Sequence, residues 1–290
     1  MYDKAAVVGV KASIIYLTRN GGAVFRESLE SVLSQEAPFE FEVIAVDSGS
    51  TDGTLEAMRA RPVMVHSIKP DEFNFGLTRD YGFSLAKGEI VVTLSQDAVP
   101  VGKSWLKDIV APFDDPSVAA VQARERLPVA DAFYWLKAGL FYYTRECKGW
   151  IRKHGGIGLS FVCCAVRRSV WDANRLGQVE MSEDKVFQKK LREKGERIIM
   201  QEKAAVFHSH QYGIVELAKR CENEGLGWRN VGQAYSFGDM VLDFFNFGMM
   251  LGYLRGLMRL EMRRPAEFLF PLIRPVFIFK GNHFTKRYVR

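Results

Sequence analysis

The sequence lacks a glycine-rich loop of the kind that binds phosphate. Neither G-x-G-x-x-G nor G-x-x-x-x-G-K-[ST] occurs anywhere in the 290 residues. Enzymes that hold a dinucleotide or a nucleoside triphosphate at the start of a helix use such loops. The sequence therefore argues against a dinucleotide dehydrogenase and against a P-loop NTPase.

Cysteine is scarce, and the four cysteines form no metal-binding pattern. C-x-x-C is absent, and Cys163 and Cys164 stand together in an apolar run, as is typical of buried thiols. The first residues contain no long apolar stretch of the kind found in signal peptides. We therefore expect a reducing, cytoplasmic compartment.

Long apolar runs are also missing. The composition, 48% hydrophobic and 26% charged, is that of an ordered globular protein. Near the C-terminus, an apolar stretch is free of charge only over residues 244–254. Eleven residues at ~1.5 Å each cannot cross a ~30 Å hydrocarbon core as a helix.

The net charge of +6 is placed unevenly. Residues 252–290 contain nine Lys and Arg against two acids, so this segment carries +7 and the rest of the chain −1. Aromatic and aliphatic residues alternate with these basic residues, which favours a helical region at an anionic membrane surface over nucleic-acid binding. The alternative is a helical layer that packs on the rest of the chain or on a dimer partner.

Apolar strands alternate with helical periodicity in the N-terminal third. Residues 12–17, 41–46, 63–68 and 89–94 are predicted strands, and residues 25–35, 54–60 and 77–86 are predicted helices, the last one stopped by Gly88. This order predicts a mostly parallel sheet with helices on both faces. The polar loops after the first, second and fourth strands then lie at one edge, where ligands bind in such sheets.

The stretch after the fourth strand directs attention to Asp97. Ser95, Gln96 and Asp97 follow the apolar run 91–94, and Pro100 closes the segment. An aspartate at the carboxyl end of a buried strand is placed to bind a ligand. The alternative is a turn aspartate that accepts hydrogen bonds from its own backbone.

Several motifs in sequence order resemble family 2 glycosyltransferases with the GT-A fold. These motifs are TRNGG (18–22), VDSGSTDGT (46–54) and FGLTRDYGFSLAKGEIVVTLSQDA (75–98). Four later stretches resemble bacterial rhamnosyltransferases: ARERLPVADAF (123–133), AVRRSVW (165–171), SEDKVFQKKLREKG (182–195) and FHSHQYG (207–213). The resemblance covers roughly residues 12–235.

The resemblance implies a GT-A-type, Rossmann-like α/β fold with a mostly parallel sheet flanked by helices. Residues 1–235 would form the glycosyltransferase domain, with a donor half at about 12–100 and an acceptor half at about 101–235. Residues 236–290 would form a basic and apolar C-terminal helical extension.

The resemblance also implies a pocket for a nucleoside diphosphate sugar. Asp47 would accept the imide N–H of uracil or thymine, and Arg79 would face the diphosphate. The alternatives are an Asx-turn for Asp47 and a solvated helix arginine for Arg79. The full predicted donor set is Thr18, Asn20, Asp47, Ser48, Arg79, Gln96 and Asp97.

A divalent cation, Mg²⁺ or Mn²⁺, is expected on the same grounds. Asp97 stands where the family has the second acid of Asp-x-Asp, while Ser95 replaces the first. The family pattern implies His210 as a further ligand and His208 as its support or as a ligand itself. Alternate residues of an extended segment point the same way, and a structural pair without a ligand is the alternative.

Asp184 is the predicted general base, with Glu183 orienting the site or holding the acceptor. Both begin an amphipathic helical stretch, so the alternative is that they only complement the helix dipole. One departure from the family lies in SFVCCAVRR (160–168), where Phe161, Cys163 and Cys164 replace polar groups expected near the acceptor.

The resulting hypothesis is an inverting glycosyltransferase of cell-surface polysaccharide synthesis. It would move a sugar, with rhamnose the first candidate, from a dTDP- or UDP-sugar to a hydroxyl of a glycan or lipid-linked glycan, in contact with the inner face of the cytoplasmic membrane. A catalytically inactive scaffold or sugar-binding protein is the alternative, motivated by the missing first acid. A nucleotidyltransferase would want a glycine-rich loop with a lysine, and TRNGG lacks that form.

Overall fold

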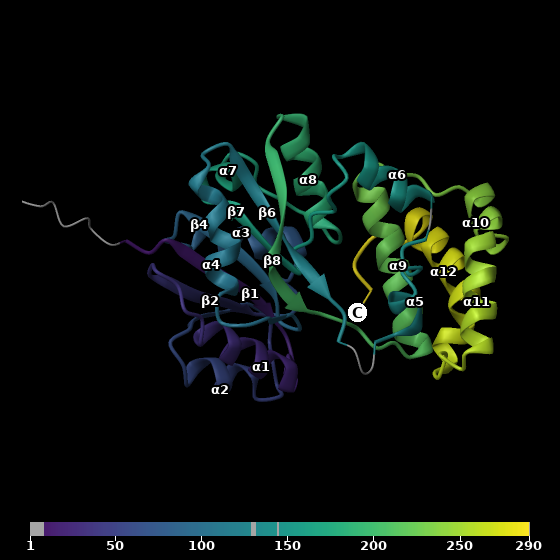
Figure 1. The fold of residues 1–290 in the computed structure, drawn as a ribbon, viewed down its shortest axis with the longest axis horizontal. Helices are drawn as coiled ribbons and strands as arrows, with labels where there is room; N and C mark the ends of the chain where they lie inside the picture. Colours follow the sequence, from purple (N-terminus) through teal and green to yellow (C-terminus); the bar gives the residue numbers. More distant parts are fainter. Residues whose placement is uncertain (1–8, 129–131, 144, 290) are drawn as a thin grey trace, which may run out of the picture. The chain divides into compact units, whose positions relative to one another are not determined.

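The computed structural model describes residues 9–128, 132–143 and 145–289, with the side chains of 145–148 left out of the description (Figure 1). The chain divides into two compact units. The first consists of Met1–Arg126, Leu159–Gly177 and Lys190–His208, and the second of Leu127–Gly158, Gln178–Lys189 and Ser209–Arg290. Each unit is described by itself.

The first unit contains an eight-stranded sheet in the order β3-β2-β1-β4-β7-β6-β8-β5. Its first half is parallel, as predicted, because each strand returns to the sheet through a helix. The neighbouring strands of this half pair in parallel. They are β1 (Ala12–Thr18), β2 (Phe41–Asp47), β3 (Met64–Ser67) and β4 (Ile90–Ser95).

The second half of the sheet is mixed. The strand β7 (Cys163–Arg167) lies antiparallel between β4 and β6 (Val118–Arg126). The strand β8 (Arg197–Phe207) runs parallel to β6, and the short β5 (Val99–Pro100) pairs antiparallel at the edge. The sheet is the mostly parallel arrangement that the sequence predicts, with β7 and β5 as its antiparallel members.

Helices cover both faces of the sheet. On one face, α1 (Gly22–Leu33), α2 (Thr54–Arg59) and α4 (Trp105–Val110) bury their apolar side chains against alternate strand residues, and the 3₁₀ turn η1 (Ala111–Asp114) follows α4. On the other face lie α3 (Phe75–Ser84) and α7 (Arg168–Asp172), where the rings of Phe83 and Trp171 meet edge to face. The predicted elements are therefore present, with ends shifted by at most three residues.

Gly88 has a different role from the predicted helix stop. The helix α3 ends at Ser84, and Gly88 does not adopt the left-handed conformation of a glycine C-cap. Instead, a Cβ at Gly88 would lie 2.7 Å from the carbonyl carbon of Ala12. Glycine is required there because the chain passes against the backbone of β1 as it enters β4.

The second unit is helical. Its buried centre is rich in aromatic rings, among them Phe133, Trp135, Phe141 and Phe270. The helices are α5 (Tyr134–Lys137), α6 (Arg145–Lys153), α8 (Glu183–Glu193, whose last residues belong to the first unit), α9 (Ile214–Asn230), α10 (Phe237–Phe244), α11 (Phe247–Met258) and α12 (Pro265–His283).

The helices α9 and α12 lie side by side and touch through their backbones (Figure 1). A Cβ at Gly225 would overlap the carbonyl oxygen of Ile278, and a Cβ at Gly281 would overlap that of Glu222. Any side chain at either glycine would separate the two helices. The C-terminal helix is therefore an integral part of this unit.

A buried ion pair joins the same two helices. Arg274 of α12 is 0% exposed and donates two hydrogen bonds to Glu224 of α9, at 2.6 and 3.1 Å. Burial acts to raise the pKa of Glu224, but Arg274 and Arg220 hold this pKa below its ordinary value. The guanidinium of Arg274 also lies 5.1 Å from the ring centroid of Phe141, a cation–π distance.

The basic charge of residues 252–290 is thus partly neutralised inside the fold. Arg274 pairs with Glu224, Lys280 with Glu222 at 2.8 Å, and Arg264 with Glu267 at 3.8 Å. Among the described residues, no helix combines the length and the apolar character needed to cross a bilayer.

We predict that Arg274→Met destabilises the protein by about 3–5 kcal/mol, because it leaves the buried Glu224 carboxylate without its main partner. Urea unfolding followed by circular dichroism measures this loss. Adding Glu224→Gln should restore part of it, since the uncompensated charge is removed.

The exposed Arg255 of α11 offers a matched control, and Arg255→Met should change stability by no more than about 0.5 kcal/mol. Equal effects of Arg274→Met and Arg255→Met would show that the buried pair does not hold α12 in place.

Candidate functional site

The loops after β1 and β2 are bonded to each other at the carboxyl edge of the sheet. Thr18 ends β1 and donates its hydroxyl to Oδ2 of Asp47, the last residue of β2, at 3.0 Å. The Ser48 amide donates to the Thr18 carbonyl at 2.9 Å. Thr18, Asp47 and Ser48 are each at most 2% exposed, so three residues of the predicted donor set form one buried group.

Asp47 accepts four hydrogen bonds in this structure. Its Oδ1 receives the amides of Gly49 and Ser50 at 3.0 and 2.9 Å, and its Oδ2 receives the hydroxyls of Thr18 and Ser50. These contacts are those of an Asx-turn. A nucleotide base that donates to Asp47 would have to displace one of the two hydroxyls, and the role predicted for Asp47 stays a prediction.

Asn20 connects the first loop to the second from the exposed side. It adopts a φ of 49°, in the left-handed region that asparagine tolerates better than most residues. Its side-chain Oδ1 accepts the Thr51 backbone amide at 2.8 Å, and its backbone N–H donates to Ser50 Oγ at 2.9 Å. Asp52 adds a bond by accepting the Gly22 amide at 2.9 Å.

Gln96 connects the third loop to the first. Its side-chain carbonyl accepts the Arg19 amide at 2.8 Å, and its Nε2 donates to the Arg19 carbonyl at 3.1 Å. The side-chain amide of Gln96 therefore pairs with both the backbone N–H and the backbone C=O of Arg19, as a residue of a neighbouring strand would. All three predicted loops meet at one edge, as the parallel strand order requires.

Arg79 lies inside the unit and not on a solvated helix face. It is 7% exposed, donates to Thr93 Oγ1 at 2.5 Å, and its guanidinium carbon is 4.7 Å from the Phe161 ring centroid. The alternative of a solvated helix arginine is therefore wrong. Contact of Arg79 with a diphosphate stays a prediction.

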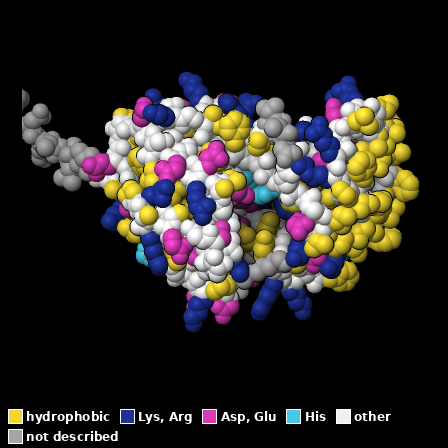
Figure 2. Space-filling view, turned by 90° about the horizontal axis from the view of Figure 1, so that it is seen from below, with side chains coloured by type: hydrophobic (Ala, Val, Ile, Leu, Met, Phe, Trp, Pro, Cys, Tyr) yellow, Lys and Arg dark blue, Asp and Glu magenta, His cyan; other side chains and the backbone are white. Residues whose placement is uncertain are grey.

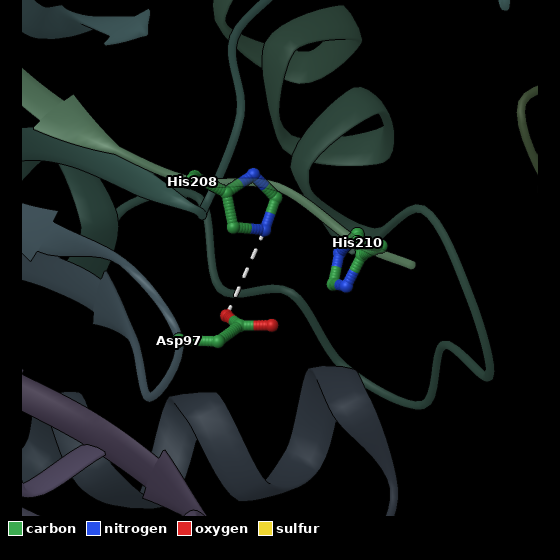
Figure 3. Close-up of side chains that lie close together, drawn as sticks. All are labelled: Asp97, His208 and His210. Atoms are coloured by element: carbon green, nitrogen blue, oxygen red, sulfur yellow. Dashed lines mark ion pairs between the residues drawn. The ribbon is translucent and has the colours of Figure 1, made fainter. Parts of the chain in front are cut away.

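Asp97 and His208 lie together where β4 and β8 end (Figure 3). His208 Nε2 is 3.7 Å from Asp97 Oδ1, and the Ser95 hydroxyl donates to the same carboxylate oxygen. The histidine side chain is 11% exposed and the aspartate side chain 32%. Ser95, which replaces the first acid of Asp-x-Asp, thus supports the second.

Glu125 contacts the other nitrogen of the same histidine. Its Oε2 lies 3.3 Å from His208 Nδ1. Because β6 and β8 run parallel with Glu125 opposite Val206, the glutamate arrives beside the residues that follow β8. The His208 amide also donates to the Arg126 carbonyl at 3.0 Å. No motif in the sequence indicates a role for Glu125, since only the β6–β8 register brings it beside His208.

His210 follows two residues after His208, so chain connectivity keeps it close to this pair, within about 7 Å along the backbone. One ligand atom from each of Asp97, His208 and His210 lies within 4.8 Å of the others (Figure 3). One carboxylate and two imidazoles suit Mn²⁺ and similar cations and leave positions for phosphate oxygens or water. The donor set fits the predicted divalent cation.

Glu183 and Asp184 belong to the second unit, where they begin α8. Asp184 Oδ1 accepts the Lys185 amide at 2.7 Å, and its Oδ2 lies 3.1 Å from Lys185 Nζ. Glu183 is 6% exposed. These positions in the first turn are also those that complement a helix dipole.

Met181 and Ser182, which precede Glu183 and Asp184, pack closely against α9. Ser182 has a φ of 61°, and a Cβ at Gly227 of α9 would overlap its hydroxyl. Asn230 Nδ2 donates to the Met181 carbonyl at 3.0 Å. The backbone that delivers Glu183 and Asp184 is therefore held by α9.

The cysteines of SFVCCAVRR lie in the sheet. Cys163 and Cys164 belong to β7 and are 0% exposed, and Phe161 just before it is 4% exposed. Burial raises the pKa of the Cys163 thiol well above its usual range. The prediction of buried thiols is confirmed, and this part of the motif fills the core.

The fold is that of a GT-A glycosyltransferase. Residues 13–175 match the family model "Glycosyl transferase family 2", and the chain belongs to this family. It is 29% identical over 230 residues to the O-antigen chain rhamnosyltransferase RfbN of Salmonella typhimurium, covering 75% of this chain and 72% of that protein. It is 31% identical over 212 residues to WbaN of Salmonella anatum, covering 69% and 66%.

Solved structures share the fold at low sequence identity. A mannosyltransferase of Pyrobaculum calidifontis, in complex with GDP-Man and Mn²⁺, has a TM-score of 0.62 at 16% identity, over 95% of this chain and 88% of that one. TarS of S. aureus with UDP-GlcNAc has a TM-score of 0.55 at 19% identity, over 95% and 74%.

We predict that Gln96→Ala loosens the loop after β1, because the Arg19 amide loses its acceptor. Hydrogen exchange at the Arg19 amide should become roughly 2–10 times faster, the range for one net hydrogen bond. The Asn20 amide, bonded to Ser50, is the internal control and should be unchanged. Unaltered exchange at Arg19 would show that Gln96 does not hold the loop.

Proposed function

We propose that this glycosyltransferase moves one sugar from a nucleoside diphosphate donor to a hydroxyl of a glycan or lipid-linked glycan, with inversion at the anomeric carbon. The observation that carries the proposal is the Asp97–His208 pair, which stands at the same sheet edge as the interlocked loops after β1, β2 and β4. Similarity to O-antigen rhamnosyltransferases supports rhamnose as the first donor sugar to test and cell-surface polysaccharide as the product.

The donor nucleotide would bind over the three loops. Asp47, with Thr18 and Asn20 beside it, would receive the imide N–H of a uracil or thymine base, so dTDP- and UDP-sugars are the proposed class. Ser48, Gln96 and Asp97 complete the edge, and Arg79 would provide positive charge toward the diphosphate after moving from Thr93. Solved relatives of this fold carry GDP-Man or UDP-GlcNAc.

Asp97, His208 and His210 would hold a divalent cation, Mg²⁺ or Mn²⁺, which neutralises the charge of the leaving diphosphate when bound. Glu125 would keep a proton on His208 Nδ1, so that the lone pair of Nε2 would be available to the cation. A carboxylate behind a histidine commonly fixes ring orientation and basicity in this way.

Asp184 would accept the proton of the acceptor hydroxyl as that oxygen attacks the anomeric carbon. Lys185 and the helix amide hold both oxygens of its carboxylate in place. Glu183 would orient the acceptor. If the acceptor is lipid-linked, the reaction would take place at the inner face of the cytoplasmic membrane.

A donor panel tests the proposal. Purified protein is incubated with dTDP-rhamnose, UDP-GlcNAc, UDP-Glc or GDP-Man, with and without glycan acceptors, and the released nucleoside diphosphate is measured. Release from one donor supports the enzyme. If no donor releases its nucleoside diphosphate, the result favours the alternative of a catalytically inactive scaffold. That alternative is suggested by Ser95, which replaces the first acid of Asp-x-Asp.

Asp184→Asn should lower transfer about 10²–10⁴-fold, the usual contribution of a general base, while UDP or dTDP binding stays near the wild-type value. The proton of the acceptor then has no destination, although the donor site is intact. Glu193→Gln, on the exposed part of the same helix, is the control. A variant at Asp184 that keeps more than half of the wild-type turnover removes this residue from the mechanism.

Asp97→Ala should weaken nucleoside diphosphate binding more strongly in Mn²⁺ than in EDTA, as measured by calorimetry. The carboxylate acts through the cation, so its loss matters little without one. Glu125→Gln should lower the Mn²⁺ affinity about 10–100-fold through His208, whereas Glu202→Gln, an exposed glutamate of β8, should not. Equal losses in Mn²⁺ and EDTA would exclude Asp97 as a ligand.

A further inference from the structure

The helices α10 and α11 expose a continuous series of large apolar side chains (Figure 2). In α11 they recur every three or four residues, which places them on one side of the helix. Figure 2 shows hydrophobic side chains gathered at the right, where Figure 1 places α10 and α11. The apolar face consists of Phe237, Val241, Leu242, Phe245, Phe247, Met250, Leu251, Leu254, Leu257, Met258 and Leu260, exposed by 37–81%.

The opposite side of α11 is already buried. Met249 is 3% exposed, and a Cβ at Gly252 or Gly256 would collide with Leu140 or Tyr134 of the same unit. The helix is therefore apolar nearly all round, with its inner side packed and its outer side facing water. A helix with this pattern is normally covered on both sides, and apolar patches of this kind mark interaction sites.

A basic cavity borders the apolar face. It has a volume of about 420 Å³ and is lined in part by Lys137, Arg255, Arg263 and Arg264, with Glu261 and Glu267 as the acids. Glu267 is 2% exposed and accepts the amides of Tyr134, Arg263 and Arg264, so its charge is largely satisfied by the backbone. Within the described residues, neither Arg255 nor Arg263 forms an ion pair with an acid.

We propose that the apolar face and this basic cavity together dock the protein on a bilayer that contains anionic phospholipid. The apolar side chains would enter the level of the headgroups and first methylenes, and the cavity would receive a lipid phosphate. Arg255 lines the cavity and belongs to α11, which also carries much of the apolar face. The two features therefore share one helix. Apolar side chains bordered by arginine are the composition of interfacial helices.

The positive charge of the cavity favours an anionic bilayer over a second copy of this chain as the partner of the apolar face. The same face of a second copy would bring a second set of unpaired arginines into contact with the first. An anionic leaflet supplies the opposite charge instead. Only part of the basic segment 252–290 would take part in this contact, because Arg274 and Lys280 form ion pairs with α9.

Vesicle flotation with the full-length protein tests the proposal. Vesicles of phosphatidylglycerol and phosphatidylcholine are compared with pure phosphatidylcholine. We expect flotation with the anionic vesicles, weakened by salt, and little with the neutral ones. Phe247→Ser with Leu251→Ser should lower the partition coefficient about tenfold or more, and Arg255→Ala with Arg263→Ala should lower it about 30-fold.

The matched controls are Val215→Ser, an exposed apolar residue of α9, and Lys87→Ala with Lys107→Ala in the first unit. They should float like the wild type, and circular dichroism should show all variants folded. The test needs no substrate, so it stands apart from the proposed reaction.

Three results would overturn the proposal. One is wild-type protein that ignores anionic vesicles. A second is equal flotation with neutral vesicles, which removes the role of the basic cavity. The third is a dimer in sedimentation analysis that Phe247→Ser with Leu251→Ser dissociates, without any vesicle binding, which would make the face a contact between copies.

Discussion

The arrangement of the loops at the carboxyl edge of the sheet depends on the parallel pairing of β1 with both β2 and β4. In this register Thr18 stands opposite Asp47, and Leu17 opposite Ser95, so the three strands end together. The turns that follow then meet without long connections, and short polar side chains are enough to join them. Asn20 and Gln96 each bond a backbone group of a neighbouring turn, and Asp47 accepts the hydroxyl of Thr18 at the end of β1. The meeting of these turns is thus a consequence of strand direction.

Much of this edge could be predicted from the sequence, because local patterns determine it. Apolar runs of strand length, each followed by a helical period, require parallel strands, and Thr18, Asp47 and Asp97 stand at their ends. Glu125 could not be found in this way. Its contact with His208 joins residues that are far apart in the chain, and only the pairing of β6 with β8 brings them together.

The C-terminal segment shows a different limit of sequence reasoning. A count of charges over residues 252–290 treats all basic residues alike. In the structure, Arg274 and Lys280 face Glu224 and Glu222 of α9, whereas Arg255 lies exposed on α11. Burial and ion pairing therefore distinguish two kinds of basic residue in this segment. Arg274 and Lys280 stabilise the helical unit, whereas Arg255 is exposed to solvent. No periodicity in the segment distinguishes the two.

The contact of α9 with α12 has a consequence for how these helices can move. At Gly225 and Gly281 the backbones meet directly, so there is no layer of side chains whose rotamers could change to permit sliding. A shift of either helix by one residue would put Cβ atoms where only hydrogens fit. The pair has a single permitted register. A force applied at α12 would be transmitted to α9 as to one solid body, and with it to Gly227, against which Ser182 packs just before Asp184.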